Sequence, residues 1–218
     1  MKTAIIAAAA GASTLMLGAG GAKALTVLYD NGPADTAEQS YKMNLGWAVA
    51  DTFTLTSDSV ASLVNFVTAS RSGDPLASID WEITASDPFA GGATVIASGT
   101  AIPLSSTSLG ENDSKGAGLW SDQISIGSVS LASGTYWLEF TNASDASGGY
   151  IYWNANGGAS SATQDPGDKS ITSESFSILG AAAITPTPEP ASWALLLAGF
   201  AGLGAALRSR RRGLAGAA

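Results

Sequence analysis

The chain has 218 residues, contains no cysteine or histidine, and carries a formal net charge of −8. The absence of cysteine excludes disulfides and zinc–cysteine sites, and the absence of histidine excludes Ser-His-Asp and Cys-His catalytic machinery. Residues 25–185 include four basic and seventeen acidic residues, so this part has a net charge of −13. Because such a surface repels phosphate backbones, we expect no nucleic-acid partner.

Residues 1–24 have the pattern of a secretory signal peptide. Lys2 provides a positive start, a weakly hydrophobic alanine-rich stretch follows, and Ala22 and Ala24 match an A-x-A cleavage site. The alternative is a buried alanine-rich helix. We expect cleavage after Ala24 and a mature chain that begins at Leu25.

Residues 25–179 contain short runs of alternating apolar and polar residues, which predict β-strands. Ile79, Trp81 and Ile83 alternate with acidic residues, and a period of two is typical of a half-buried strand. The nine predicted strands span residues 25–29, 51–55, 63–68, 79–83, 94–102, 123–129, 136–140, 150–153 and 175–179.

Glycine pairs and Ser-Gly or Asn-Gly steps separate these runs at regular short intervals. No long stretch of helical periodicity precedes residue 191. The pattern predicts an all-β domain over residues 25–179, folded as an antiparallel β-sandwich or jelly roll. Its tryptophans are expected to supply much of the core. These tryptophans are Trp47, Trp81, Trp120, Trp137 and Trp153.

The most ligand-like stretch of this domain consists of Tyr152, Trp153, Asn154 and Asn156. An exposed aromatic ring stacks on the apolar face of a sugar, and asparagine amides hydrogen-bond its hydroxyl groups. In the alternative interpretation, which we favour, residues 150–153 form a strand with one face in the core. The first interpretation predicts glycan binding, and the second predicts only a structural role.

A cluster of Asp30, Asn31 and Asp35 lies near a predicted turn. Carboxylate and amide oxygens in loops are ligands that suit calcium. The spacing does not match an EF-hand, however, and Asp and Asn are common in turns for local reasons. We therefore expect no cofactor, with calcium at these three residues as the alternative.

Asp80 and Glu82 are the carboxylates that come nearest to a catalytic pair. Glycoside hydrolysis needs two acids that face each other across a cleft. Because these two residues alternate with core positions on one predicted strand, we interpret them as solvated. The sequence therefore favours a protein that is not an enzyme.

The C-terminal tail combines a proline strip, an uncharged stretch and an arginine cluster. Prolines at positions 186, 188 and 190 fix φ and push the preceding residues into extended geometry. A helix over residues 191–207 would span about 25 Å, at the short end of the transmembrane range. Clustered arginines stop transfer and hold that end in the cytoplasm. These arginines are Arg208, Arg210, Arg211 and Arg212.

This order of elements resembles the PEP-CTERM sorting signal of Gram-negative bacteria. The resemblance covers residues 188–212 and begins with the triplet Pro188, Glu189 and Pro190. It implies that exosortase, a multipass membrane enzyme, recognises the triplet, removes the helix and passes the protein to the cell surface. The family typically occurs with exopolysaccharide and biofilm loci, which implies an association with extracellular polysaccharide.

The body is similar to ectodomains that are often attached to PEP-CTERM tails. The stretches YDNG at 29–32, GTYWLEFTNA at 134–143 and YWNANGG at 152–158 carry this resemblance. It implies no particular activity.

The sequence thus predicts a signal peptide, a β-rich ectodomain, a linker, a sorting signal and a short tail. We expect a non-enzymatic protein of the cell surface or extracellular matrix. It would be exported through a Sec-type signal, held in the inner membrane by its helix, and then sorted. The alternative is a carbohydrate-binding module displayed at the surface. The predicted segments are 1–24, 25–179, 180–187, 188–212 and 213–218.

Overall fold

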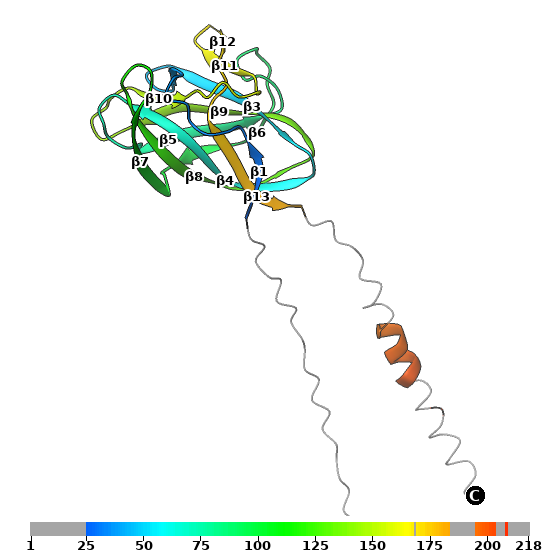
Figure 1. The fold of residues 1–218 in the computed structure, drawn as a ribbon. Coiled ribbons are helices and arrows are strands. Elements are labelled where there is room, and N and C mark those ends of the chain that lie inside the picture. Colours follow the sequence, from blue (N-terminus) through cyan, green and yellow to red (C-terminus); the bar gives the residue numbers. More distant parts are fainter. Residues whose placement is uncertain (1–24, 168, 184–194, 204–207, 209–218) are drawn as a thin grey trace, which may run out of the picture. The chain divides into compact units, whose positions relative to one another are not determined.

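The computed structural model describes residues 25–167, 169–183, 195–203 and 208, drawn in colour in Figure 1. The chain divides into two compact units, Met1–Ala182 and Ala183–Ala218, which are described separately below. The predicted signal peptide, with Ala22 and Ala24, lies outside the described residues.

The described part of the first unit is built from antiparallel strands, which confirms the all-β prediction. The strands are β1 (Thr26–Asp30), β2 (Ser40–Lys42), β3 (Ala48–Leu55), β4 (Ser59–Ser70), β5 (Ser78–Thr84), β6 (Val95–Ala101), β7 (Ser105–Asn112), β8 (Gly118–Leu131), β9 (Gly134–Ser144), β10 (Ile151–Asn154), β11 (Ala162–Asp165), β12 (Lys169–Ile171) and β13 (Phe176–Ala182).

The first sheet is organised around the long strand β4. One edge of β4 pairs with β8 along its length, and β8 pairs in turn with β7. The other edge pairs with β13 from Ser59 to Phe66 and with β10 from Thr68 to Ser70. β1 lies beside β13, as Figure 1 shows, and β2 lies beside β10.

The second sheet has the order β12-β11-β3-β9-β5-β6. Along its central strands, buried side chains alternate with more exposed ones, as the sequence pattern predicts for β5 and β9. Ile79, Trp81 and Ile83 of β5 are buried, as are Leu138 and Phe140 of β9. The two sheets therefore each present one apolar face to a shared core.

Aromatic side chains join the two sheets across this core. The ring centroid of Phe140 on β9 lies 4.5 Å from that of Phe66 on β4 and 4.6 Å from that of Trp153 on β10. These distances lie at the close end of the range for favourable aromatic pairs. The buried indole of Trp153 donates from Nε1 to the carbonyl oxygen of Ser175 at 3.0 Å, so its polar group is satisfied.

The nine predicted strands correspond to β1, β3, β4, β5, β6, β8, β9, β10 and β13. Sequence reasoning missed β2, β11 and β12, which are only three or four residues long, and β7, which is rich in serine and mostly exposed. β13 also continues to Ala182, so the first three residues of the predicted linker 180–187 belong to the strand.

The tryptophan prediction was right for only part of the set. Trp153 is fully buried and Trp81 is 7% exposed, and both belong to the core. Trp47, Trp120 and Trp137 are only half-buried. The core is supplied instead by phenylalanine, isoleucine and leucine side chains, with two tryptophans among them.

A buried carboxylate also lies within the first sheet. Asp122 on β8 is 1% exposed, and its Oδ2 accepts a hydrogen bond from Thr68 Oγ1 at 2.6 Å. Its Oδ1 has no hydrogen-bond partner among the described residues. Because burial disfavours the charged form, the pKa of Asp122 is raised to about 6.

We expect Trp153→Ala to lower the free energy of unfolding by about 3–5 kcal/mol, because it opens a cavity between the two sheets. Urea unfolding of the full chain in detergent measures this loss. Trp137→Ala, which removes a half-buried tryptophan from β9, is the matched control and should lose clearly less. Equal losses would contradict the central role of Trp153 in the core.

A second prediction concerns pH. The raised pKa of Asp122 means that its contribution to stability is complete below its unfolded pKa and is lost as the pH rises through about 6. Asp122→Asn mimics the protonated acid, so we expect the variant to gain stability over wild type near pH 8, to keep about half of that gain near pH 5 and to lose the rest below about pH 4. The shift corresponds to up to about 3 kcal/mol.

Thermal unfolding of both proteins across this pH range measures the difference. Glu111→Gln, which neutralises an exposed carboxylate on β7, serves as the control for the loss of one negative charge. A difference between Asp122→Asn and wild type that does not change with pH would show that Asp122 titrates normally.

Candidate functional site

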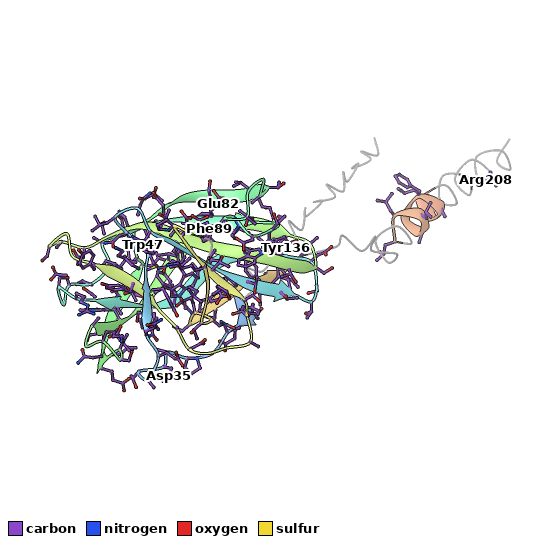
Figure 2. All side chains as sticks on the ribbon, turned by 90° about the horizontal axis from the view of Figure 1, so that it is seen from above. Asp35, Trp47, Glu82, Phe89, Tyr136 and Arg208 are labelled. Atoms are coloured by element: carbon purple, nitrogen blue, oxygen red, sulfur yellow. The ribbon has the colours of Figure 1, made fainter. Side chains whose placement is uncertain are left out.

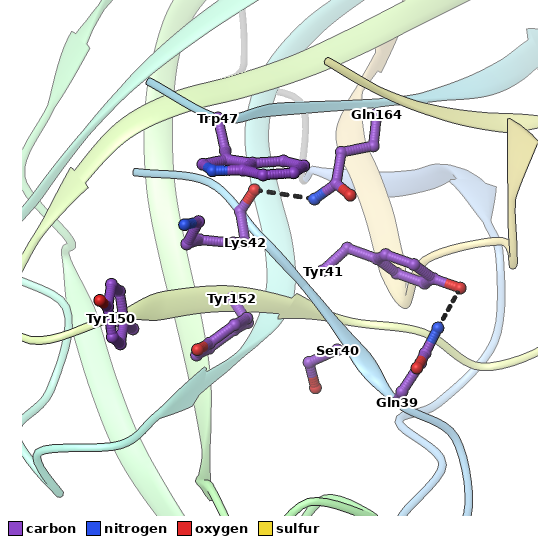
Figure 3. Close-up of a pocket in the computed structure, with 8 residues that line it drawn as sticks. All are labelled: Gln39, Ser40, Tyr41, Lys42, Trp47, Tyr150, Tyr152 and Gln164. Atoms are coloured by element: carbon purple, nitrogen blue, oxygen red, sulfur yellow. Dashed lines mark hydrogen bonds between the residues drawn. The ribbon is translucent and has the colours of Figure 1, made fainter. Parts of the chain in front are cut away.

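An open hollow lies where the first sheet meets strand β11 of the second sheet (Figure 3). Its volume is about 320 Å³. We call it the aromatic hollow, because four of the residues that line it are aromatic. The lining residues come from β2, β10, β11 and the adjacent loops. They are Gln39, Ser40, Tyr41, Lys42, Trp47, Tyr150, Tyr152 and Gln164.

A basic side chain lies among the aromatic rings of the hollow. Lys42 Nζ is 4.7 Å from the ring centroid of Trp47 and 5.1 Å from that of Tyr150. Lys42 also lies directly opposite Tyr152 across the β2–β10 pair, so the two side chains share one face of the sheet. Such cation–π contacts contribute about 0.5–1 kcal/mol each at exposed sites and hold the ammonium group in place.

Amide and hydroxyl groups complete the lining. Gln39 Nε2 donates to the hydroxyl of Tyr41 at 2.7 Å, and Gln164 Nε2 donates to the carbonyl oxygen of Lys42 at 3.2 Å, as the dashed lines in Figure 3 show. Tyr150 is 48% exposed, and Trp47 and Tyr152 are half-buried. The hollow therefore presents aromatic surface together with hydrogen-bonding groups to solvent.

The structure brings only Tyr152 of the predicted glycan-binding residues into this hollow. The prediction was wrong for Trp153 and Asn154, because both side chains have 0% exposure and no ligand can reach them. The alternation along β10 sends Trp153 into the core, as the structural interpretation of this stretch expected. Asn154 instead holds the loop before β2, since its Oδ1 accepts from the backbone N–H of Asp35 at 3.2 Å.

Asn156 also has a structural role. Its side-chain amide donates to the carbonyl oxygen of Asn31, and its Oδ1 accepts from the backbone N–H of Gly158 at 2.9 Å. Sequence reasoning missed Lys42 and Trp47, which face Tyr150 in the folded protein. The only sequence signal for them was the proximity of Tyr41, Lys42 and Trp47 before the strand at 48–55, because β2 itself is too short to predict.

The predicted calcium residues do not converge on one point. Asp30 Oδ1 accepts from the backbone N–H of Gly32 at 2.9 Å, and Asp35 Oδ1 accepts from that of Ala37 at 2.8 Å. Asp35 lies at the periphery of the strand-rich unit in Figure 2. Both carboxylates thus close local turns.

Asn31 points away from these two carboxylates. Its side-chain amide donates to Ser173 Oγ and to the carbonyl oxygen of Glu174, each at 2.6 Å. Among residues 25–167, 169–183, 195–203 and 208, no three acidic, histidine or cysteine side chains are grouped to hold a metal ion.

The second sheet carries a row of acids on its outer face, near the position where Glu82 is labelled in Figure 2. Glu82 lies directly opposite Glu139 on β9, and burial together with the charge of Glu82 raises the pKa of Glu139 to about 7. Asp80, in contrast, accepts hydrogen bonds from Thr100 Oγ1 at 2.5 Å and Asn142 Nδ2 at 2.9 Å. The pair that faces across strands is therefore Glu82–Glu139, and Asp80 is engaged in structural contacts.

The second unit contains a helical stretch at residues 195–203, and Arg208 is described separately beyond it. The predicted triplet Pro188, Glu189 and Pro190 lies outside the described residues, as do the two ends of the predicted span 191–207 and the arginines at 210–212. Within the described stretches, no helix is long and apolar enough to cross a membrane. The predicted membrane span therefore stays a prediction.

Comparison with known families gives a match on the tail. Residues 186–212 match the PEP-CTERM protein-sorting motif. No curated protein shows a significant match to the chain. The matched residues include the Pro-Glu-Pro triplet and the arginine cluster, and they begin two residues before the sequence-predicted signal. The chain is therefore a protein that carries a PEP-CTERM sorting motif at residues 186–212.

Proposed function

We propose that the chain is a non-enzymatic protein of the cell surface or extracellular matrix, exported and then sorted through its tail by an exosortase. The match of residues 186–212 to the PEP-CTERM motif carries this proposal. In this role the β-rich body is the cargo that remains outside the cytoplasm, folded as a β-sandwich ectodomain.

The chemistry of the tail accounts for how it is recognised. Proline fixes φ near −65° and cannot donate a backbone hydrogen bond, so from the sequence we expect an extended strip around Pro188 and Pro190, which is the form that a protease cleft accepts. Residues 191–207 are uncharged and hold this strip at the bilayer surface. The four arginines at 208–212 keep the far end on the cytoplasmic side.

We further propose that the body binds an extracellular polysaccharide through the aromatic hollow. The observation in its favour is the exposed cluster of Trp47, Tyr150 and Tyr152 beside amide and hydroxyl groups. Aromatic rings stack on the apolar faces of sugar rings, while glutamine and tyrosine side chains hydrogen-bond hydroxyl groups. This proposal moves the glycan site from the stretch 152–156 to residues gathered from β2, β10, β11 and the adjacent loops.

Positive charge at the hollow favours a glycan that carries acidic groups. Lys42 lies between two of the rings, and the guanidinium carbon of Arg71 lies 6.0 Å from the ring centroid of Tyr152. These are two of only four basic residues between positions 25 and 185, in a body that is otherwise strongly acidic. An acidic group on a sugar would therefore be attracted locally to this point, whereas the net negative charge of the body repels a polyanion elsewhere on the surface.

The sorting proposal predicts a defined C-terminus. The protein recovered from its producing cells should have lost the helix and arginines, so its C-terminal peptide should end near Pro188–Pro190. The triple change Pro188→Ala, Glu189→Gln and Pro190→Ala should leave a full-length chain in the membrane fraction. Intact-mass spectrometry and C-terminal peptide mapping measure both outcomes.

Leu214→Ala, which lies beyond the matched residues, is the control and should be processed normally. A wild-type chain that still ends at Ala218 would overturn the sorting proposal and leave a membrane-anchored ectodomain.

The glycan proposal predicts that Trp47→Ala and Tyr150→Ala each weaken binding about tenfold, equivalent to about 1.4 kcal/mol. The probe is the exopolysaccharide isolated from the producing cells, and affinity electrophoresis of the full chain in detergent measures retardation. Trp137→Ala removes a tryptophan of similar exposure from the second sheet and should leave binding unchanged.

Two results would count against the hollow as the binding site. Wild-type protein that is not retarded at all would refute polysaccharide binding by this chain. Retardation that is reduced equally by all three substitutions would show a general effect of surface aromatic residues instead of a site.

A further inference from the structure

Strand β6 is an edge of the second sheet, and one of its two sides has no partner strand in the described part of the chain. It pairs with β5 on the other side. The ladder with β5 runs without interruption from Ala97 to Ala101, and a bulge precedes it at Ile96. An edge strand carries a row of unpaired backbone N–H and C=O groups, which another extended strand can bind.

The other terminal strands of the two sheets are less open to pairing. β2 and β12 have only three residues each. The ladder of β1 with β13 is interrupted after Val27, and that of β7 with β8 is interrupted after Ser108. Short strands, bulges, charges and prolines protect an edge from pairing. β6 contains no charge and no proline, so it is the longest regular edge left open among the described residues.

Exposed apolar side chains gather around β6. Val95 at its start is 50% exposed, and Ile102 just beyond its end is 75% exposed. Such a concentration on a soluble body marks a contact surface. Of the nine exposed large apolar side chains between positions 25 and 183 that the structure describes, five belong to this segment, namely Val95, Ile96, Ile102, Leu104 and Leu109.

The distribution of charge selects the partner. Residues 88–110 are the longest uncharged stretch within positions 25–185, where seventeen acids and four bases give a net charge of −13. A basic partner would bind the acidic surface elsewhere, because opposite charges attract. Two identical acidic bodies repel each other over most of their surface, so they can approach most closely at this uncharged edge.

We propose that β6 pairs with β6 of a second copy of this chain in antiparallel orientation, so that two second sheets join into one continuous sheet. The two-fold axis of such a pair passes near Gly99, the middle of the edge. The start of each strand then lies beside the end of the other, which brings Val95 and Ile96 of one copy to Ile102 of the second copy. The same apolar contact forms at both ends, and the isologous pairing closes as a dimer.

The acids of the neighbouring strand set the salt dependence of this dimer. Asp80 and Glu82 on β5 lie opposite Thr100 and Ser98. In the joined sheet the two β5 strands are separated by both copies of β6, which corresponds to about 14 Å. Because the Debye length is about 8 Å at physiological ionic strength, salt screens this repulsion. The dimer should therefore be weaker at low salt and stronger as NaCl is added.

This inference is independent of the sorting and glycan proposals, because it rests only on the edge, its apolar ends and the charge pattern. A dimer would display two aromatic hollows on one particle. Two sites that engage the same polymer bind it more tightly than one site does, without any new contact within each site.

Light scattering after gel filtration of the full chain in mild detergent, over a dilution series, measures the mass of the protein. We expect a dimer for the wild type. Ile102→Lys places a charge at both ends of the interface and should raise the dissociation constant at least about tenfold. Val27→Lys, which changes an exposed apolar residue on the edge strand β1, is the matched control and should leave the dimer intact.

A crosslinking experiment locates the interface, because the chain contains no cysteine of its own. Ser98→Cys on β6 should give a covalent dimer with a short bis-maleimide. Ser170→Cys, on β12 at the opposite edge of the same sheet, should not. A wild type that is monomeric at every concentration would overturn the proposal. So would a dimer that Ile102→Lys leaves unchanged, or one that crosslinks through Ser170→Cys and not through Ser98→Cys.

Discussion

The alternation of side chains along the short strand β10 fixes both the core and the aromatic hollow. Trp153 points inward, where it contacts Phe140 of the opposite sheet and donates its indole N–H to Ser175. Its neighbour Tyr152 must then point outward, opposite Lys42 of β2. A shift of one residue in this strand would exchange the two rings and remove both features at once. The strength of the core contact thus maintains the geometry of the surface.

Three acids lie in the interior of the described part of the chain, and no lysine or arginine of that part is buried with them. Asp51, Asp122 and Glu174 are each at most 1% exposed, and burial raises the pKa of each. Asp51 is surrounded by hydrogen-bond donors, Asp122 has one, and Glu174 has none among the described residues. The three therefore form a series of increasing need for a hydrogen-bond partner, with Glu174 at its end.

The sequence predicted the fold class well because period-two patterns report directly on which side chains face the core. The alternation at Ile79, Trp81 and Ile83 is an example, and all three are buried. Strands such as β2 and β11 were missed because three or four residues carry too few alternations to stand out from a loop. The register and pairing of the strands could not be predicted from the sequence, because they depend on contacts between residues that are distant along the chain.

Among the functional sites, the sorting motif could be predicted from the sequence and the aromatic hollow could not. The sorting motif is contiguous, so its residues could be identified from their order alone, and the match at 186–212 agrees with them. The aromatic hollow combines Trp47, Tyr150 and Gln164 from separate parts of the chain, and the pairings of β2 with β10 and of β11 with β3 bring them together. Which of the predicted residues Tyr152, Trp153 and Asn154 can reach a ligand depends on burial. The sequence alone does not show that the tyrosine faces solvent and the tryptophan faces the core.

In a chain exported as proposed, the position of β13 would link the completion of the fold to the end of translocation. This last strand lies between β1 and β4, so the first and last strands of the body are neighbours, with Thr26 paired to Gly180. A chain that crosses a membrane from its N-terminus leaves β1 and the long edge of β4 open until residues 176–182 emerge. Only then can the sheet close, a few residues before the proline strip arrives. For an exported chain, this order of segments would make the finished body and the accessible sorting motif nearly simultaneous events.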